Sequence, residues 1–199
     1  MSIQTRRGHE RAERERLIVT AARELAEAEG WDAVTTRRLA AEIEYSQPVL
    51  YSHFKGKDAI MAAVAVQGFA ELATELRTAR TAAEGAQEAL AAVGETYTAF
   101  ARRRPALYDA MFTHTLDLPF ATAQAPAALQ EAFGELHAAV GPIAADGDEP
   151  GLLTETYWAG LHGLVTLMRS GRLPAEGHAR RLALLIGHFT AGASREATA

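Results

Sequence analysis

Residues 35–58 read TTRRLAAEIEYSQPVLYSHFKGKD, and this stretch decides the fold class of the chain. Thr35 is an N-cap candidate for a short helix that ends near Ile43, and Ser46 is an N-cap candidate for a second short helix. A longer helix is expected to precede them over residues 10–29. Two short helices joined by a tight turn and supported by a longer helix are typical of a helix-turn-helix unit.

The side chains of this unit are of the kinds that bind DNA. Thr36 and Arg37 lie in the first turn of the first short helix, where free N–H groups and the positive end of the helix dipole favour phosphate. Gln47 can form two hydrogen bonds with the major-groove edge of adenine, and the apolar Val49 can meet a thymine methyl group. Four further side chains can donate to phosphate oxygens, namely Tyr51, His53, Lys55 and Lys57. Ordinary surface exposure is the alternative interpretation of Tyr51 and His53.

The rest of the chain is also predicted to be helical. Alanine, the best helix former, makes up roughly a fifth of the residues, and no alternating run of β-branched residues reaches the length of a strand. Helical spacing of apolar residues predicts helices at about 57–80, 86–103, 105–112, 129–140 and 150–169, and a last one that includes 182–189. Residues 114–126 contain two prolines and are expected to form a loop. The predicted fold is therefore all-α, with about nine helices.

Composition excludes several classes of protein. The chain has no cysteine, which excludes disulfide frameworks, thiolate zinc sites and thiol nucleophiles. Its N-terminus is polar and charged, and no run approaches the ~18 apolar residues of a membrane span, so we expect a soluble cytoplasmic protein with no membrane partner. The net charge of −5 argues against a nucleic-acid partner when the chain is taken whole. However, residues 1–57 carry 10 Lys+Arg and 9 Asp+Glu, so the acidity belongs to the remainder.

Residues 35–40, 46–54 and 55–58 together resemble the reading head of the TetR family of transcriptional regulators, and the similarity covers about residues 10–65. The resemblance implies that Arg37, Gln47, Pro48 and Val49 approach bases, while Thr36, Tyr51, His53 and Lys57 hold the DNA backbone. The chain departs from the family at Glu44, where a glycine is usual in the turn. A left-handed conformation at a glutamate costs about 1 kcal/mol.

The resemblance also implies that a DNA-binding domain of residues 1–57 is followed by an effector-binding and dimerisation domain of residues 58–199. The predicted helix 150–169 is apolar over much of its circumference and needs two partners. One is the core of its own domain and the other is a dimer mate, which makes a homodimer through the last two helices. Residues 158–163 further resemble the Trp-His-Gly signature of one TetR C-terminal subtype.

An apolar pocket with a few polar groups is the usual composition of a small-molecule site. Aromatic residues and histidines at helical spacing supply the candidates for an effector pocket, which are Tyr97, Phe100, Met111, Phe112, Phe133, His137, Trp158 and His162. The alternative is a filled core, because aromatic stripes at helical spacing are most often core and a lone histidine in such a stripe is commonly satisfied there.

Nothing in the sequence indicates a catalytic or metal-binding site. The histidines show no short metal-ligand spacing, no Glu-x-x-His pair is present, and Gly56-Lys57 lacks the rest of a phosphate-binding loop. We therefore expect no catalytic residues, no metal and no cofactor.

These observations predict a dimeric regulator, most simply a repressor, that binds a palindromic operator in double-stranded DNA and is released by a small, largely apolar effector. One alternative is a DNA-binding regulator without an effector. Another is a helical small-molecule-binding protein or enzyme whose N-terminal helices only pack.

Overall fold

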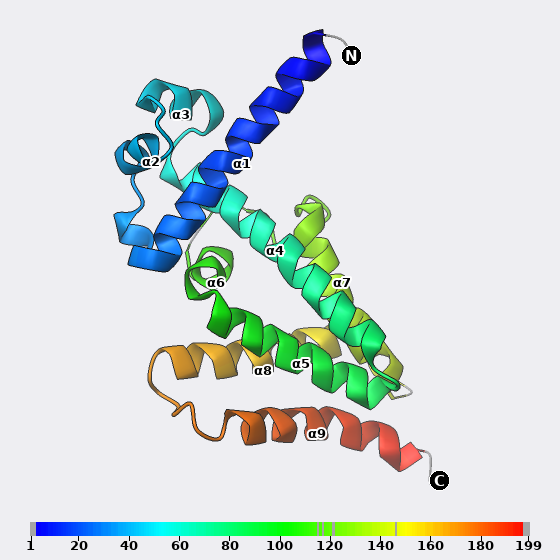
Figure 1. Cartoon of the computed structure of the whole chain (residues 1–199). Coiled ribbons are helices and arrows are strands. Elements are labelled where there is room, and N and C mark those ends of the chain that lie inside the picture. The colour runs from blue at the N-terminus through cyan, green and yellow to red at the C-terminus, as the bar shows by residue number, and fades with distance from the viewer. Residues whose placement is uncertain (1–2, 115, 117, 121, 146, 197–199) are drawn as a thin grey trace. The chain divides into compact units, whose positions relative to one another are not determined.

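The computed structural model describes residues 3–114, 116, 118–120, 122–145 and 147–196, and every regular element in these ranges is a helix (Figure 1). The all-α prediction is confirmed. The helices are α1 (Ile3–Glu29), α2 (Thr36–Glu42), α3 (Gln47–His53), α4 (Lys57–Ala82), α5 (Ala86–Arg103), α6 (Pro105–Phe112), α7 (Ala127–Val140), α8 (Pro150–Arg169) and α9 (His178–Glu196), with short 3-10 turns at Trp31–Ala33 and Gly141–Ile143.

The chain forms two compact units. Unit 1 comprises Met1–Gly68 and Arg104–Pro126, and unit 2 comprises Phe69–Arg103 and Ala127–Ala199. By these contacts the boundary falls inside α4, and α6 belongs with the N-terminal helices. The functional division at residues 57 and 58 therefore differs from the compact units and stays a prediction.

The helix α1 begins at Ile3, seven residues earlier than the sequence pattern predicts. The exposed first turns gain ion pairs between residues four apart, Arg6 with Glu10 and Arg11 with Glu15, which favour the helical state. Buried Ile18, together with Leu39 of α2 and Leu50 of α3, supplies the core of the helix-turn-helix.

Glu44 adopts the left-handed conformation in the turn between α2 and α3, with φ of 57°. The cost of about 1 kcal/mol is offset locally: the amide of Tyr45 donates to Ala40 O at 2.8 Å, and the amide of Glu44 donates to Ala41 O at 3.3 Å. The Thr35 cap is present, since its Oγ1 accepts from the Arg38 amide at 3.1 Å. Ser46 occupies the N-cap position of α3 but its side chain makes no capping hydrogen bond, so that part of the prediction was wrong.

Unit 2 is built around α5, which contacts α7, α8 and α9. Its buried face carries Leu90, Val93, Tyr97 and Phe100, as the helical spacing predicts. The α8 and α9 helices touch closely at Gly160, where a Cβ would lie 2.8 Å from a methyl carbon of Leu185.

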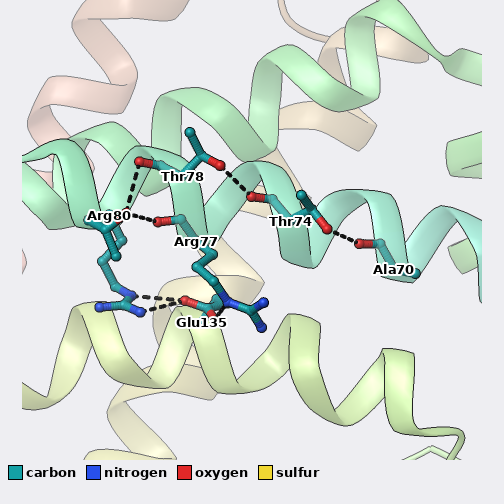
Figure 2. A network of polar contacts seen from close by, with 7 residues as sticks. Ala70, Thr74, Arg77, Thr78, Arg80 and Glu135 are labelled. Carbon is teal, nitrogen blue, oxygen red and sulfur yellow. Dashed lines mark hydrogen bonds and ion pairs between the residues drawn. The ribbon is translucent and has the colours of Figure 1, made fainter.

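A clasp of two arginines on one glutamate joins the second half of α4 to α7 (Figure 2). Arg77 Nε donates to Glu135 at 2.7 Å, and Arg80 donates to the other oxygen at 2.9 and 2.8 Å. Burial alone would raise the pKa of Glu135, but the hydrogen bonds from both arginines hold that pKa below its usual value. The carboxylate therefore stays charged and the clasp persists at neutral pH.

By length and composition alone, α4 is the one helix within the described ranges that is long and apolar enough to cross a membrane. Half of its apolar window is buried inside the protein. A core helix passes the same test, so α4 gives no argument for a membrane span.

Candidate functional site

The first turns of α2 and α3 present most of the side chains predicted to meet DNA. Arg37, Gln47, Pro48 and Tyr51 are exposed, and Tyr51 retains 53% of its accessible surface. Val49 is half-buried beside them. The two helices are joined at this surface, because the Thr36 hydroxyl lies 3.4 Å from the Tyr51 hydroxyl. We call these six residues the reading surface: Thr36, Arg37, Gln47, Pro48, Val49 and Tyr51.

The neighbouring arginines Arg37 and Arg38 have different environments. Arg38 donates two hydrogen bonds to the carboxylate of Glu29 at the end of α1, at 2.7 and 2.5 Å. These bonds lower the pKa of Glu29 and raise that of Arg38. Within the described part of the chain the side chain of Arg37 has neither a hydrogen bond nor an ion pair. Arg38 therefore fixes α2 against α1, and Arg37 remains available to a ligand.

Two predicted backbone contacts, His53 and Lys57, are engaged within the protein. The side chain of His53 is only 6% exposed, and its Nδ1 lies 3.3 Å from Glu15, which also accepts from Arg11 at 2.9 Å. Lys57 Nζ donates to the backbone carbonyl of Trp31. The geometry gives His53 a role in seating α3 on α1. Lys57 retains further N–H groups, because an ammonium has three donors.

Three of the predicted effector residues come together in unit 2. The indole N–H of Trp158 donates to the Tyr97 hydroxyl at 3.0 Å, and that hydroxyl lies 3.4 Å from Nδ1 of His162. Burial lowers the pKa of His162, so its imidazole is neutral at pH 7. Phe100 is fully buried one turn further along α5. We call Tyr97, Trp158 and His162 the aromatic cluster.

The other four effector candidates do not join this cluster. Phe133 is 38% exposed, and His137 is exposed on the same helix, where its Nδ1 lies 3.2 Å from the Thr154 hydroxyl. Met111 and Phe112 belong to unit 1, where Met111 is buried and the Phe112 ring lies tilted by 51° against Tyr108, with the ring centroids 4.7 Å apart. Helical spacing places residues on one face of a helix but does not determine which unit that face joins.

Sequence reasoning missed an open groove between α4 and α5 in unit 2, with a volume of about 450 Å³. Its lining residues are Thr74, Glu75, Thr78, Ala79, Glu95, Thr96, Ala99 and Arg103. The threonines recur at four-residue spacing on α4, which was the available signal. The groove is open and contains none of the predicted effector residues, whereas the aromatic cluster is held by hydrogen bonds, so the cluster is the candidate effector site. Among the residues with a described position, no group of three metal-binding side chains is present.

Acidification from about pH 7.5 to about pH 5.5 is expected to destabilise unit 2 through two histidines. His178 Nε2 lies 3.1 Å from the Thr98 hydroxyl, while its Nδ1 is buried with no partner. Burial, with the charges of Arg102 and Arg181, lowers the pKa of His178, and burial lowers that of His162, both from 6.5. The unfolded chain therefore binds more protons, so this stability is present above about pH 6.5 and is lost as pH falls towards the lower folded pKa.

Thermal midpoints across that pH range measure the effect. The midpoint of His178→Asn should fall less than that of the wild type, whereas the exposed His9→Asn should behave like the wild type. Equal pH dependence in all three proteins would contradict a neutral His178 in the folded state.

Two short helices present an arginine, a glutamine and a tyrosine at one exposed surface, and a separate helical unit follows. That arrangement defines a helix-turn-helix DNA-binding regulator. Residues 18–64 match the model of bacterial regulatory proteins of the tetR family, and residues 90–189 match the tetracyclin repressor-like C-terminal domain. The chain belongs to the TetR family of bacterial transcriptional regulators. Proteins of this family are DNA-binding regulators rather than enzymes.

Curated relatives are also regulators. An uncharacterised HTH-type regulator of Mycobacterium tuberculosis is 27% identical over 154 residues, covering 77% of this chain and 69% of the relative. An uncharacterised HTH-type regulator of Bacillus subtilis is 32% identical over 96 residues, or 48% of this chain, and the match spans half of that relative. The class D tetracycline repressor of Escherichia coli is 44% identical over 50 residues, which cover 25% of this chain and 23% of the repressor.

Solved structures share the fold. A Rhodococcus protein of unknown function superposes with a TM-score of 0.75 at 24% identity, covering 89% of this chain and 94% of that chain. Bacillus subtilis FadR, crystallised with stearoyl-CoA, superposes with a TM-score of 0.65 at 13% identity, and the match covers 88% of this chain and 97% of FadR. An Acinetobacter baumannii TetR variant, crystallised with minocycline, superposes with a TM-score of 0.59 at 22% identity, and the match covers 89% of this chain and 94% of the variant.

Proposed function

We propose that the chain is a cytoplasmic repressor that binds a palindromic operator as a homodimer and is released by a small, largely apolar effector. The observation that carries the DNA-binding part is the exposed reading surface, where Arg37 and Gln47 project from the first turns of two adjacent helices. Backbone N–H groups at those turns add positive potential toward phosphate. Thr36 and Tyr51, and with them Lys57, are the proposed backbone contacts.

The proposed dimer interface lies on α8 and α9. Leu152 and Leu184 are 59% and 58% exposed in the single chain, and Leu167 is 40% exposed. Large apolar side chains at this exposure favour a protein partner. A twofold mate covers them and sets the distance between two reading surfaces, which must be about 34–36 Å for successive major grooves.

The proposed effector site is the aromatic cluster of unit 2. Two aromatic rings and a neutral imidazole make a mostly apolar lining with a few polar atoms, which suits a small, largely apolar molecule. The solved relatives with minocycline and stearoyl-CoA show that related folds accept dissimilar molecules. We therefore propose the class of effector and not its identity. The resemblance of residues 158–163 to the Trp-His-Gly subtype remains part of this proposal.

One observation favours a second candidate, a regulator without an effector. Tyr97 is 1% exposed and Phe100 is fully buried, and the polar atoms of the aromatic cluster already contact one another. A ligand would have to separate these side chains. The two candidates share the DNA-binding step and differ only in release.

Titration of a duplex from the region upstream of the chain's own gene tests the shared step. Binding should weaken steeply between about 50 and 200 mM salt, because a few phosphate contacts release counterions. A scrambled duplex of the same length is the control and should bind at least tenfold more weakly. Absent binding, or binding without salt dependence, contradicts the proposed function.

A further inference from the structure

The first half of α1 has no packing partner within its own chain. Every residue from 5 to 14 is exposed, and the first buried side chain of α1 is that of Ile18. Figure 1 shows this part of α1, which we call the α1 arm, extending beyond α2 and α3. Most of the stability of a helix in a protein comes from packing one face against other elements. The exposed arm therefore favours a partner that covers it.

One face of α1 carries residues at alternating spacings of three and four. This spacing places side chains on one side of a helix and is the pattern of helices that pair with a second helix. We call this face the α1 seam. Arginines occupy its N-terminal half, apolar side chains follow, and a glutamate ends it. In chain order its residues are Arg7, Glu10, Arg14, Leu17, Ala21 and Glu24.

The second half of the seam borders a groove between α1 and the turn that follows α2, with a volume of about 340 Å³. We call it the α1–α2 groove. Leu17 in its lining is 44% exposed, which is high for a large apolar side chain. The lining combines apolar side chains with three carboxylates, and its residues are Leu17, Thr20, Ala21, Glu24, Glu42, Ile43 and Glu44.

The charge of the N-terminal part of α1 is opposite to that of the groove. Residues 1–16 contain five arginines and three glutamates, whereas the groove lining contains three glutamates and no basic residue. Among the described residues, the side chains of Arg7, Arg14 and Glu24 have neither a hydrogen bond nor an ion pair. Opposite charges at the two ends of one seam are complementary when a second copy of the helix runs antiparallel to the first.

An antiparallel pair of α1 helices brings these groups together. With a twofold axis between residues 15 and 16, Arg7 faces the partner's Glu24, and Arg14 faces the partner's Leu17. An arginine opposite Leu17 also enters the α1–α2 groove, where two further carboxylates lie. Because the contact is twofold, each of these pairs forms twice.

We propose that the α1 seam is an interface between two copies of this chain, in which the α1 helices pair antiparallel and each arm lies along the partner's α1–α2 groove. This interface lies in unit 1 and is separate from the surface on α8 and α9, so it joins one assembly to another. It does not depend on operator binding. Ion pairs between exposed side chains weaken with salt, so the association is reversible and belongs to low ionic strength.

Sedimentation velocity of the protein alone, at about 20 and about 500 mM salt, tests the proposal. The mass at low salt should be at least about double the mass at high salt. Arg7→Glu places two carboxylates opposite each other and should raise the dissociation constant of this step about fivefold or more. Glu24→Arg places two arginines opposite each other and should have the same effect. Arg16→Glu makes the same charge change on the opposite face of α1 and is the matched control, which should associate like the wild type.

The double variant is the decisive comparison. Combining Arg7→Glu with Glu24→Arg restores opposite charges, so the dissociation constant should return to within about twofold of the wild-type value. An effect of net charge alone would make the two single variants change the association in opposite directions. All three positions are exposed, so thermal midpoints should change little.

Three results would overturn the proposal. One is a mass that does not depend on salt, and another is a double variant that associates no better than the single variants. The third is a constant mass together with weaker binding of the upstream duplex in Arg7→Glu but not in Arg16→Glu, which would assign the arm to DNA phosphates instead.

Discussion

Gly94→Ala is expected to lower the stability of the protein by about 2–4 kcal/mol, one of the largest effects of any single methyl group in this chain. A Cβ at this position would clash with the hydroxyl oxygen of Tyr157 and would lie 3.3 Å from a methyl carbon of Leu161. Tyr157 is fully buried, and its hydroxyl donates to Leu90 O at 2.7 Å. The rigid phenol cannot move aside without breaking that bond.

A double-mutant cycle separates the clash from a general effect of alanine. Tyr157→Phe alone should cost about 1 kcal/mol, because it removes one buried hydrogen bond. In the double variant the missing hydroxyl makes room for the new methyl group, so the two costs should sum to more than the double variant loses. Gly163→Ala, where a Cβ meets open space, is the matched control on α8. Thermal midpoints measure the effect, and additive costs would contradict the predicted contact.

The helix-turn-helix was predictable because its signals are local. The Thr35 cap and the exposed Gln47 and Pro48 at the start of α3 depend on residues within one or two turns. The left-handed turn was also located, at Glu44, although only the structure shows which backbone hydrogen bonds offset its cost. Local chemistry therefore fixed the place of the reading surface.

Other features were beyond sequence reasoning because they depend on contacts between distant residues. No local pattern pairs Glu27 with the first turn of α6, or Glu135 with the two arginines of α4. The exposure of single side chains could not be predicted either, because Phe133 fits the apolar stripe of α7 and is nevertheless 38% exposed. Arg37 and Arg38 are indistinguishable by type and spacing. Only the carboxylate of Glu29, nine residues before Arg38, separates their roles.

Arg37→Ala is accordingly expected to weaken operator binding about 5- to 150-fold, which corresponds to about 1–3 kcal/mol for one good contact to a base or phosphate. Gln47→Ala should cause a loss of similar size confined to one base position, because glutamine reads an adenine edge. Both side chains are exposed, so thermal midpoints should change little. Fluorescence anisotropy with the upstream duplex and single-base variants of it measures both effects.

Arg38→Ala is the matched control for Arg37→Ala, since it removes the same charge from the next residue. Because Arg38 is bound to Glu29 through two hydrogen bonds, its loss should leave the salt dependence of DNA binding unchanged. If Arg37 contacts a phosphate, Arg37→Ala should make the slope of log binding constant against log salt concentration shallower by about one. If Arg37 contacts a base, this slope should stay unchanged and the preference at one base position should relax. Because both side chains of the pair are exposed to solvent, Arg38→Ala should change the stability of the protein little. Equal losses of DNA affinity and equal changes of slope in the two variants would show that net charge, and not the placement of Arg37 on the reading surface, determines binding.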